Sequence, residues 1–157
     1  MMNSDAVDKI IESADTQCEN RGSRLSKKRT QILRCLLLQE KPISAYGLID
    51  IYRENFGGDM PATSVYRILG FLQENSLAHK LQLQNKYIAC SHISCDHDHG
   101  SPQFLICVQC KAVKEVGNNV GLVAEMNKVF ERSEFRMITP QVEMVGICGQ
   151  CQRVDSG

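Results

Sequence analysis

Tryptophan is absent from this chain, and aromatic residues make up only 6% of it. So few large ring side chains favour small hydrophobic cores over one large core. The length of 157 residues suits one domain of ordinary size or two small ones. Hydrophobic residues still amount to 43% of the chain, which is enough for folded cores.

We expect no secretory leader, and the sequence has no long hydrophobic run. Residues 1–15 carry Asp5, Asp8, Glu12 and Asp15, and no run approaches the roughly 18 apolar residues that a membrane span needs. Eight cysteines in a chain without a leader favour a reducing compartment, where thiols bind metal instead of forming disulfides. We therefore expect a cytoplasmic protein with no membrane partner.

Net charge is a third feature that the chain lacks, because 18 basic and 18 acidic residues balance each other. The charges are unevenly placed, however. Residues 20–39 contain no acid, and their basic members are Arg21, Arg24, Lys27, Lys28, Arg29 and Arg34. Such a block can bind phosphate, and we take Arg24, Lys28 and Arg29 as candidate DNA contacts. The alternative is a solvated helix face whose long stems lie along apolar surface.

The first half of the chain shows the periodicity of four helices followed by a hairpin. Apolar spacing predicts helices over 6–18, 26–39, 45–55 and a stretch after Pro61, with Ser26, Ser44 and either Thr63 or Ser64 as caps. Weak alternation over 77–83 and 87–90 predicts two strands. Helices followed by a two-stranded ribbon are the layout of a winged helix-turn-helix.

The second half predicts a smaller α/β unit. A polar stretch over 91–103 reads as a hinge or metal loop. Strand is predicted over 104–116 and 135–147, and helix over 119–133. We therefore expect an α+β protein with a winged-helix DNA-binding domain (1–90), a hinge (91–103) and an α/β dimerisation domain (104–157). A unit this small needs a zinc ion or a second subunit for stability.

The predicted fourth helix has a side that can read DNA. Val65, Ile68, Leu69 and Leu72 form its apolar stripe, and Arg67 lies nearly opposite. If the stripe packs inward, Arg67 points outward near the helix N-terminus, where arginine can donate two hydrogen bonds to guanine. The alternative is a solvated arginine on an ordinary amphipathic helix.

Four cysteines form the strongest local motif. Cys107 and Cys110 make one C-x2-C pair, and Cys148 and Cys151 make another. Two such pairs in one small unit predict a structural zinc ion bound by four thiolates, in preference to a redox C-x2-C. Four thiolates saturate zinc, so we expect this site to be closed to substrate.

A second metal site is indicated by the residues left over. His79 lies on the first predicted wing strand and Cys90 ends the second, so the hairpin can bring them together. His97, His99 and Glu115 are further possible ligands, and a thiolate in such a set disfavours Fe(II) and Mn(II). The alternative gives each residue an ordinary structural role, as a packed histidine, a small buried thiol or a solvated carboxylate.

Several sequence motifs of the chain together resemble those of a known family. The fragments PATSVYRILGFLQENSLAHK, YIAC, HDHG, FLICVQCKAVKE and GICGQC are similar to the ferric uptake regulator superfamily, most of all to its zinc-sensing branch. The resemblance runs from about Arg24 to Cys151. It implies a dimeric repressor that binds operator DNA when loaded with metal, and a function in controlling zinc uptake genes.

The resemblance also implies roles for particular residues. Its structural zinc cysteines match Cys107, Cys110, Cys148 and Cys151, and its regulatory zinc ligands match His79, Cys90, Glu115 and a histidine before FLIC. His99 is the nearest in spacing, although its spacing to Cys107 is one residue longer than the resemblance implies, so His97 stays open. Its DNA-binding residues match Tyr46, Ser64, Tyr66 and Arg67, with Ser64 where the family usually has threonine. Two zinc ions per chain are expected. The histidine-rich tail of some relatives is missing.

Other functions are less well supported by the sequence. An iron, manganese or peroxide sensor of the same superfamily would not need Cys90 as a ligand. A zinc hydrolase would need an open site with a general base, and the chain has no H-E-x-x-H motif. A thiol oxidoreductase would need a reactive C-x2-C. We therefore expect no enzyme activity, and no small-molecule substrate beyond the metal ion.

Overall fold

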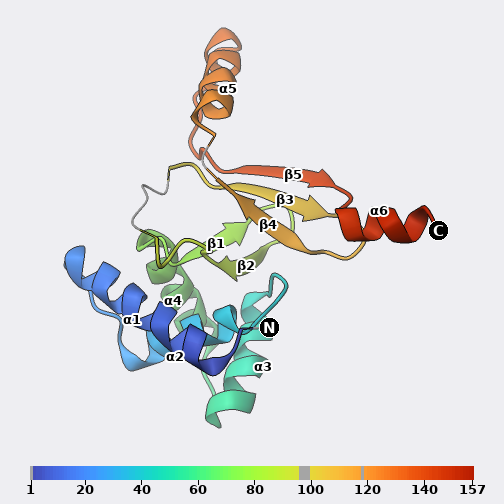
Figure 1. Cartoon of the computed structure of the whole chain (residues 1–157). Helices are drawn as coiled ribbons and strands as arrows, with labels where there is room; N and C mark the ends of the chain where they lie inside the picture. The colour runs from blue at the N-terminus through green and yellow to red at the C-terminus, as the bar shows by residue number, and fades with distance from the viewer. Residues whose placement is uncertain (1, 96–99, 118) are drawn as a thin grey trace. The chain divides into compact units, whose positions relative to one another are not determined.

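The computed structural model describes residues 2–95, 100–117 and 119–157. The chain folds into two compact units, Met1–Asp96 (unit 1) and His97–Gly157 (unit 2). Figure 1 shows the helices of unit 1 beside a two-stranded hairpin, and in unit 2 a sheet with two helices. The fold class predicted from the sequence is confirmed, because these units are a winged helix-turn-helix and a small α/β unit.

Unit 1 is built on four helices that share one hydrophobic core. Leu33, Leu48, Leu69 and Leu72 are fully buried, and they come from three of these helices. The apolar stripe predicted for the fourth helix therefore does face inward. The helices are α1 (Ser4–Asn20), α2 (Lys27–Leu37), α3 (Ala45–Phe56) and α4 (Ala62–Glu74).

The helix ends agree in part with the predicted caps. The Ser44 hydroxyl accepts a hydrogen bond from the Gly47 amide at 3.0 Å, as an N-cap should. For α4 the predicted caps are wrong, because the helix begins at Ala62 after Pro61 and includes Thr63 and Ser64. The Pro61 carbonyl accepts the Ser64 and Val65 amides at 2.9 and 3.2 Å, so the first turn is already formed there.

The hairpin of unit 1 forms the wing. Its strands β1 (Ala78–Leu81) and β2 (Lys86–Ala89) are antiparallel, with Ala78 opposite Ala89 and Leu81 opposite Lys86. Ile43 adds a bridge to Tyr87, with N–H···O distances of 3.0 and 2.8 Å. The chain between α2 and α3 is thereby tied to the wing.

Unit 2 contains a three-stranded sheet of order β4-β3-β5, with β3 (Gln103–Cys107) antiparallel to β4 (Val113–Val116) and parallel to β5 (Val142–Gly146). The single strand predicted over 104–116 is wrong. The Cys107–Cys110 pair makes a tight turn there, in which Lys111 adopts a left-handed φ of 64°. The helices of unit 2 are α5 (Val120–Arg132) and α6 (Gly149–Asp155). Of these two helices, α6 was not predicted from the sequence.

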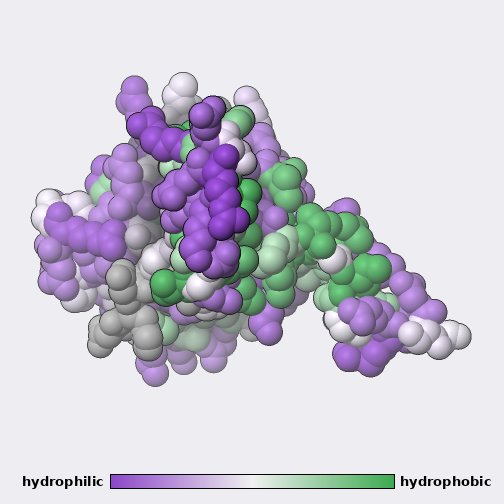
Figure 2. Space-filling view, turned by 90° about the horizontal axis from the view of Figure 1, so that it is seen from above, coloured by the Kyte–Doolittle hydropathy of each residue, from purple (hydrophilic) through white to green (hydrophobic). Residues whose placement is uncertain are grey.

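Much of the apolar surface of unit 2 is open. None of the residues of α5 is buried, and Val129 is 59% exposed. On the sheet, Leu105 and Val145 are 43% and 57% exposed beside an apolar cavity of about 370 Å³. Figure 2 shows hydrophobic side chains (green) exposed over the sheet, on the side toward α6. Surface of this kind marks an association site.

Over the described residues, no helix combines the length and apolar character that crossing a membrane requires.

Candidate metal centres and nucleic-acid interface

The two C-x2-C pairs come together at one end of the sheet of unit 2. Cys107 ends β3, Cys110 lies in the following turn, and Cys148 and Cys151 lie at and just inside the start of α6. Their four sulfur atoms lie within 4.8 Å of one another. The parallel pairing of Cys107 with Gly146 explains this, because it places the segment before α6 beside the first turn.

Hydrogen bonds in this cluster favour the thiolate form of two of its cysteines, Cys107 and Cys148. The amides of Cys148 and Cys110 point at the Cys107 sulfur, the former from 3.4 Å, and lower the pKa of this thiol to about 6. The Cys148 pKa is also lowered, chiefly by the Cys151 amide. The pKa of Cys151 shifts in the opposite direction. The Cys151 thiol forms a hydrogen bond with the Cys148 sulfur, which favours the neutral thiol and raises the Cys151 pKa to about 12. The cluster suits a tetrahedral thiophilic cation such as zinc, which compensates four negative sulfurs at once.

Two candidate ligands of the second metal site lie together in unit 1. A ring nitrogen of His79, on β1, and the sulfur of Cys90, just after β2, are within 4.8 Å of each other. The Cys90 amide donates to the Leu77 carbonyl at 2.9 Å, which extends the hairpin by one residue. Cys90 is 3% exposed. A nitrogen and a sulfur donor at this spacing can bind one ion.

The other predicted ligands of that site belong to unit 2. Glu115 lies on β4, opposite Phe104, and its side chain is half-buried. His97 and His99 lie outside the described residues. The choice between these two histidines therefore stays a prediction.

Unit 1 presents the predicted DNA-reading side chains outward. Tyr66 is 46% exposed and Arg67 is exposed on the first turns of α4, while Ser64 beside them is half-buried. Tyr46, in the first turn of α3, is 66% exposed. Both tyrosine rings are therefore accessible from solvent.

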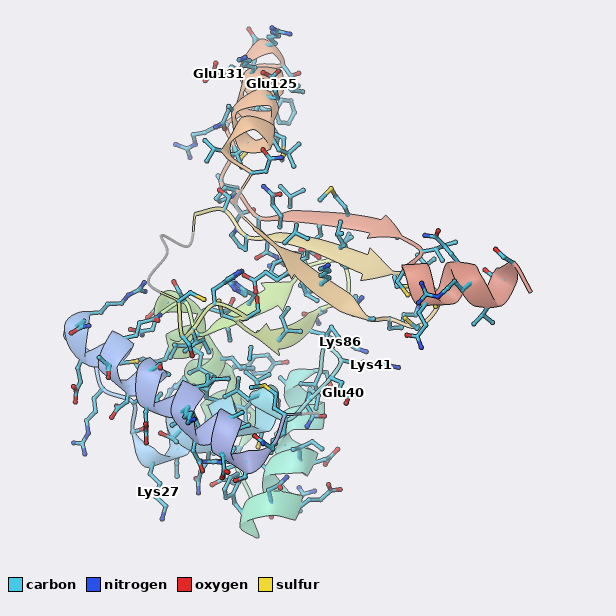
Figure 3. All side chains as sticks on the ribbon, in the orientation of Figure 1. Lys27, Glu40, Lys41, Lys86, Glu125 and Glu131 are labelled. Atoms are coloured by element: carbon cyan, nitrogen blue, oxygen red, sulfur yellow. The ribbon has the colours of Figure 1, made fainter. Side chains whose placement is uncertain are left out.

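The basic block is divided between solvent and the protein. Arg24 and Lys28 are exposed, and Lys27 points away from the ribbon at the start of α2 (Figure 3). Arg29 is more occupied: its guanidinium lies 3.6 Å from the centre of the Phe71 ring and donates to the Arg24 carbonyl at 2.7 Å. Arg29 therefore orders this surface as well as adding charge to it.

Two further basic residues were missed by the sequence reading. Lys41 and Lys86 lie at the same edge of unit 1 (Figure 3), because the bridge between Ile43 and Tyr87 brings their segments together. Because Lys41 and Lys86 are far apart in the sequence, no local sequence pattern indicates that they lie together. Only the pairing of the wing with the α2–α3 connection could have revealed them.

Comparison with known proteins decides the family. The sequence model of the ferric uptake regulator family matches residues 20–145. The chain belongs to this family. The zinc uptake regulation protein of Escherichia coli is 34% identical to the chain over 155 residues, covering 99% of the chain and 88% of that protein. The ferric uptake regulation protein of Legionella pneumophila is 25% identical over 138 residues, covering 87% and 96%.

Two solved structures are also similar to this chain over nearly its whole length. A zinc uptake regulator complexed with zinc and DNA matches with a TM-score of 0.85 and 29% identity, covering 99% of the chain and all of that structure. The holo form of XcZur matches with a TM-score of 0.78 and 31% identity, covering 92% and 98%.

Proposed function

We propose that this ferric uptake regulator family member is a zinc-responsive repressor that binds operator DNA as a metal-loaded dimer and controls zinc uptake genes. The observation that carries the proposal is the pairing of His79 with the Cys90 thiol in the wing, since a thiolate ligand favours zinc over Fe(II) and Mn(II). The relatives named for zinc uptake regulation support it. As a regulator of promoters, the protein acts in the cytoplasm. It is a DNA-binding regulator and has no enzyme activity.

Two zinc ions per chain are proposed. The first belongs to the four-cysteine cluster, whose donors all come from unit 2 and leave no ligand position for a substrate. Its role is structural, because it joins the β3–β4 turn to the start of α6. The exposed apolar surface of α5 and of the sheet supplies the contact with the second subunit.

The second zinc is regulatory, with His79, Cys90, His99 and Glu115 as its proposed ligands. When bound, zinc supplies a fixed cross-link among these four side chains. His79 and Cys90 belong to the DNA-binding unit and Glu115 to the other unit, so common ligation restricts how the units move. In a dimer this restriction sets the spacing of two α4 helices, which must suit major grooves about 34 Å apart.

The energy required for this switch is modest. Zinc shifts the population only by its differential affinity for the arrangement in which all four ligands meet, and about 5.5 kcal/mol changes a ratio of 1:99 to 99:1. Loss of one or two ligands in the other arrangement weakens a four-ligand site by more than this.

The proposal is tested by a gel shift on the promoter of a zinc uptake gene across free zinc, iron and manganese. We expect a retarded complex only with zinc, together with two zinc ions per chain measured by atomic emission. An equal response to iron or manganese would instead identify another sensor of this family.

Arg67 gives a prediction for DNA reading. Arg67→Ala should weaken operator binding about 10- to 100-fold, because one bidentate arginine–guanine contact contributes about 1–3 kcal/mol of discrimination. Fluorescence anisotropy with operator and scrambled duplexes measures this. Lys28→Ala is the matched control. It should weaken both duplexes alike and reduce the salt slope by about 1. If Arg67→Ala also affected both equally, Arg67 would be a phosphate contact.

A further inference from the structure

The helices α1 and α4 end with the same backbone motif. At the end of α1, the Gly22 amide donates to the Glu19 carbonyl and the Ser23 amide to the Cys18 carbonyl, both at 2.9 Å. Gly22 has a left-handed φ of 73°. These two bonds are the Schellman pattern, which satisfies carbonyls that a helix leaves open at its C-terminus.

At the end of α4 the same pattern occurs without a glycine. The Ser76 amide donates to the Gln73 carbonyl at 3.0 Å, and the Leu77 amide to the Leu72 carbonyl at 2.8 Å. Ser76 has a φ of 57°. A non-glycine residue is disfavoured in this region, so surrounding contacts must hold the turn in place.

Side chains from the end of α1 supply those contacts. Gln17 Nε2 donates to the Asn75 carbonyl at 2.6 Å, and Ser23 Oγ lies 2.8 Å from Asn75 Oδ1. Arg21 Nη1 donates to the Glu74 carbonyl at 3.2 Å and lies 3.3 Å from Ser76 Oγ. We name these three donors, Gln17, Arg21 and Ser23, the α1–α4 clasp. Positive charge beside a helix C-terminus also complements its dipole.

Asn75 is the residue that the clasp holds. It is a polar residue only 6% exposed, and its own amide group donates from Nδ2 to the Phe71 carbonyl at 2.9 Å. Its side-chain oxygen and its main-chain carbonyl are both satisfied by the clasp. A buried amide left without such partners is costly, so the last turn of α4 depends on α1 for its geometry.

The clasped turn continues directly into the regulatory metal ligands. Leu77, the last residue of the turn, accepts the Cys90 amide at 2.9 Å, and His79 follows two residues later on β1. The segment 75–79 therefore connects the C-terminal end of the DNA-reading helix with both unit 1 candidate ligands. A displacement of His79 or Cys90 must be accommodated either in this turn or by movement of α4.

We infer that the α1–α4 clasp couples zinc binding at His79 and Cys90 to the position of α4, so that Gln17 and Ser23 are positioning residues for operator recognition. The inference rests on the proposed function. With the clasp intact, the turn 75–77 stays rigid and ligand movement passes to α4. With the clasp broken, the turn absorbs the movement, and zinc binds with less effect on DNA affinity.

The test measures operator affinity with and without zinc in the full-length protein. Gln17→Glu keeps the size of the side chain but replaces its donor with an oxygen that faces the Asn75 carbonyl. Ser23→Ala is a second variant, which removes the hydroxyl beside Asn75 Oδ1 and, with it, the 3.1 Å contact of that hydroxyl with the Cys18 carbonyl. Thr16→Ala is the control, since Thr16 is an exposed neighbour whose hydroxyl bonds only to the Glu12 carbonyl of its own helix in the contacts seen here.

We expect both clasp variants to reduce the zinc-induced gain in operator affinity about 10-fold, the order of one well-made hydrogen bond. Affinity without zinc, zinc per chain and the circular dichroism spectrum should stay as in the unmodified protein. By linkage, operator DNA should also raise zinc affinity about 10-fold less in these variants.

A purely structural clasp gives a different result. Operator affinity would then fall by the same factor with and without zinc, or the Tm would fall while the zinc-induced gain stayed unchanged. Either outcome overturns the inference. If the unmodified protein showed no zinc-dependent operator binding, the proposed function would fail instead, and this would be evident before any variant is compared.

Discussion

Replacement of Cys90 by serine should abolish zinc-dependent operator binding, with a loss of at least about 100-fold in the affinity gained on adding zinc. The hydroxyl is a poor zinc ligand compared with thiolate, so the four-ligand set loses its strongest donor. Cys90 is buried at the end of the hairpin, where serine has nearly the same volume. Titration of operator DNA by anisotropy at saturating free zinc measures the effect.

Cys95→Ser is the matched control for this experiment. Cys95 is an exposed thiol five positions further along the chain, and no ligand role is assigned to it. Its replacement should leave the zinc response intact, and both variants should retain the zinc of the four-cysteine cluster. A Cys90→Ser protein that still responded to zinc would show that the regulatory site lies elsewhere.

A second large effect is expected from Cys110→Ser, which removes one thiolate from the proposed structural zinc site. Structural zinc contributes about 10–16 kcal/mol of apparent binding free energy in small zinc-dependent folds, which exceeds the stability of most domains. Unit 2 should therefore lose its zinc, its cooperative unfolding transition and the dimer. Sedimentation velocity and zinc release with a colorimetric chelator measure these losses.

The control for Cys110→Ser is Gln109→Ser in the same turn. Gln109 donates to the Asp155 carboxylate at 2.6 Å, and this exposed contact should contribute little to stability. The zinc content and sedimentation coefficient of the Gln109→Ser variant should match those of the unmodified protein. If Cys110→Ser stayed dimeric with its zinc bound, three thiolates would suffice and the stabilising role of the site would be smaller than proposed.

Residue types and spacing predicted the local elements well. The stripe of Val65, Ile68, Leu69 and Leu72 fixed which side of α4 is buried, and so predicted that Arg67 is exposed. Ser44 acts as the expected cap because its hydroxyl needs only a backbone amide three residues later. These features depend on neighbours within one or two turns, and local periodicity is enough to specify them.

Other features could not be read locally. The strand predicted over 104–116 is broken because the C-x2-C turn requires a left-handed Lys111. The start of α6 and the parallel β3–β5 pairing follow from assembly of the sheet, and no local periodicity signals them. The nearness of Lys41 to Lys86 depends on one bridge between distant segments.

The sequence by itself determined which side chains are candidates for the proposed sites: four paired cysteines, a histidine and a cysteine on a predicted hairpin, and an arginine opposite an apolar stripe. Covalent spacing and side-chain chemistry are properties of the chain, so they need no fold to be recognised. Only the tertiary structure decided that the end of α1 holds the end of α4 and the turn leading to Cys90. Those contacts join residues more than fifty positions apart, which pack together only after both helices have found the same core.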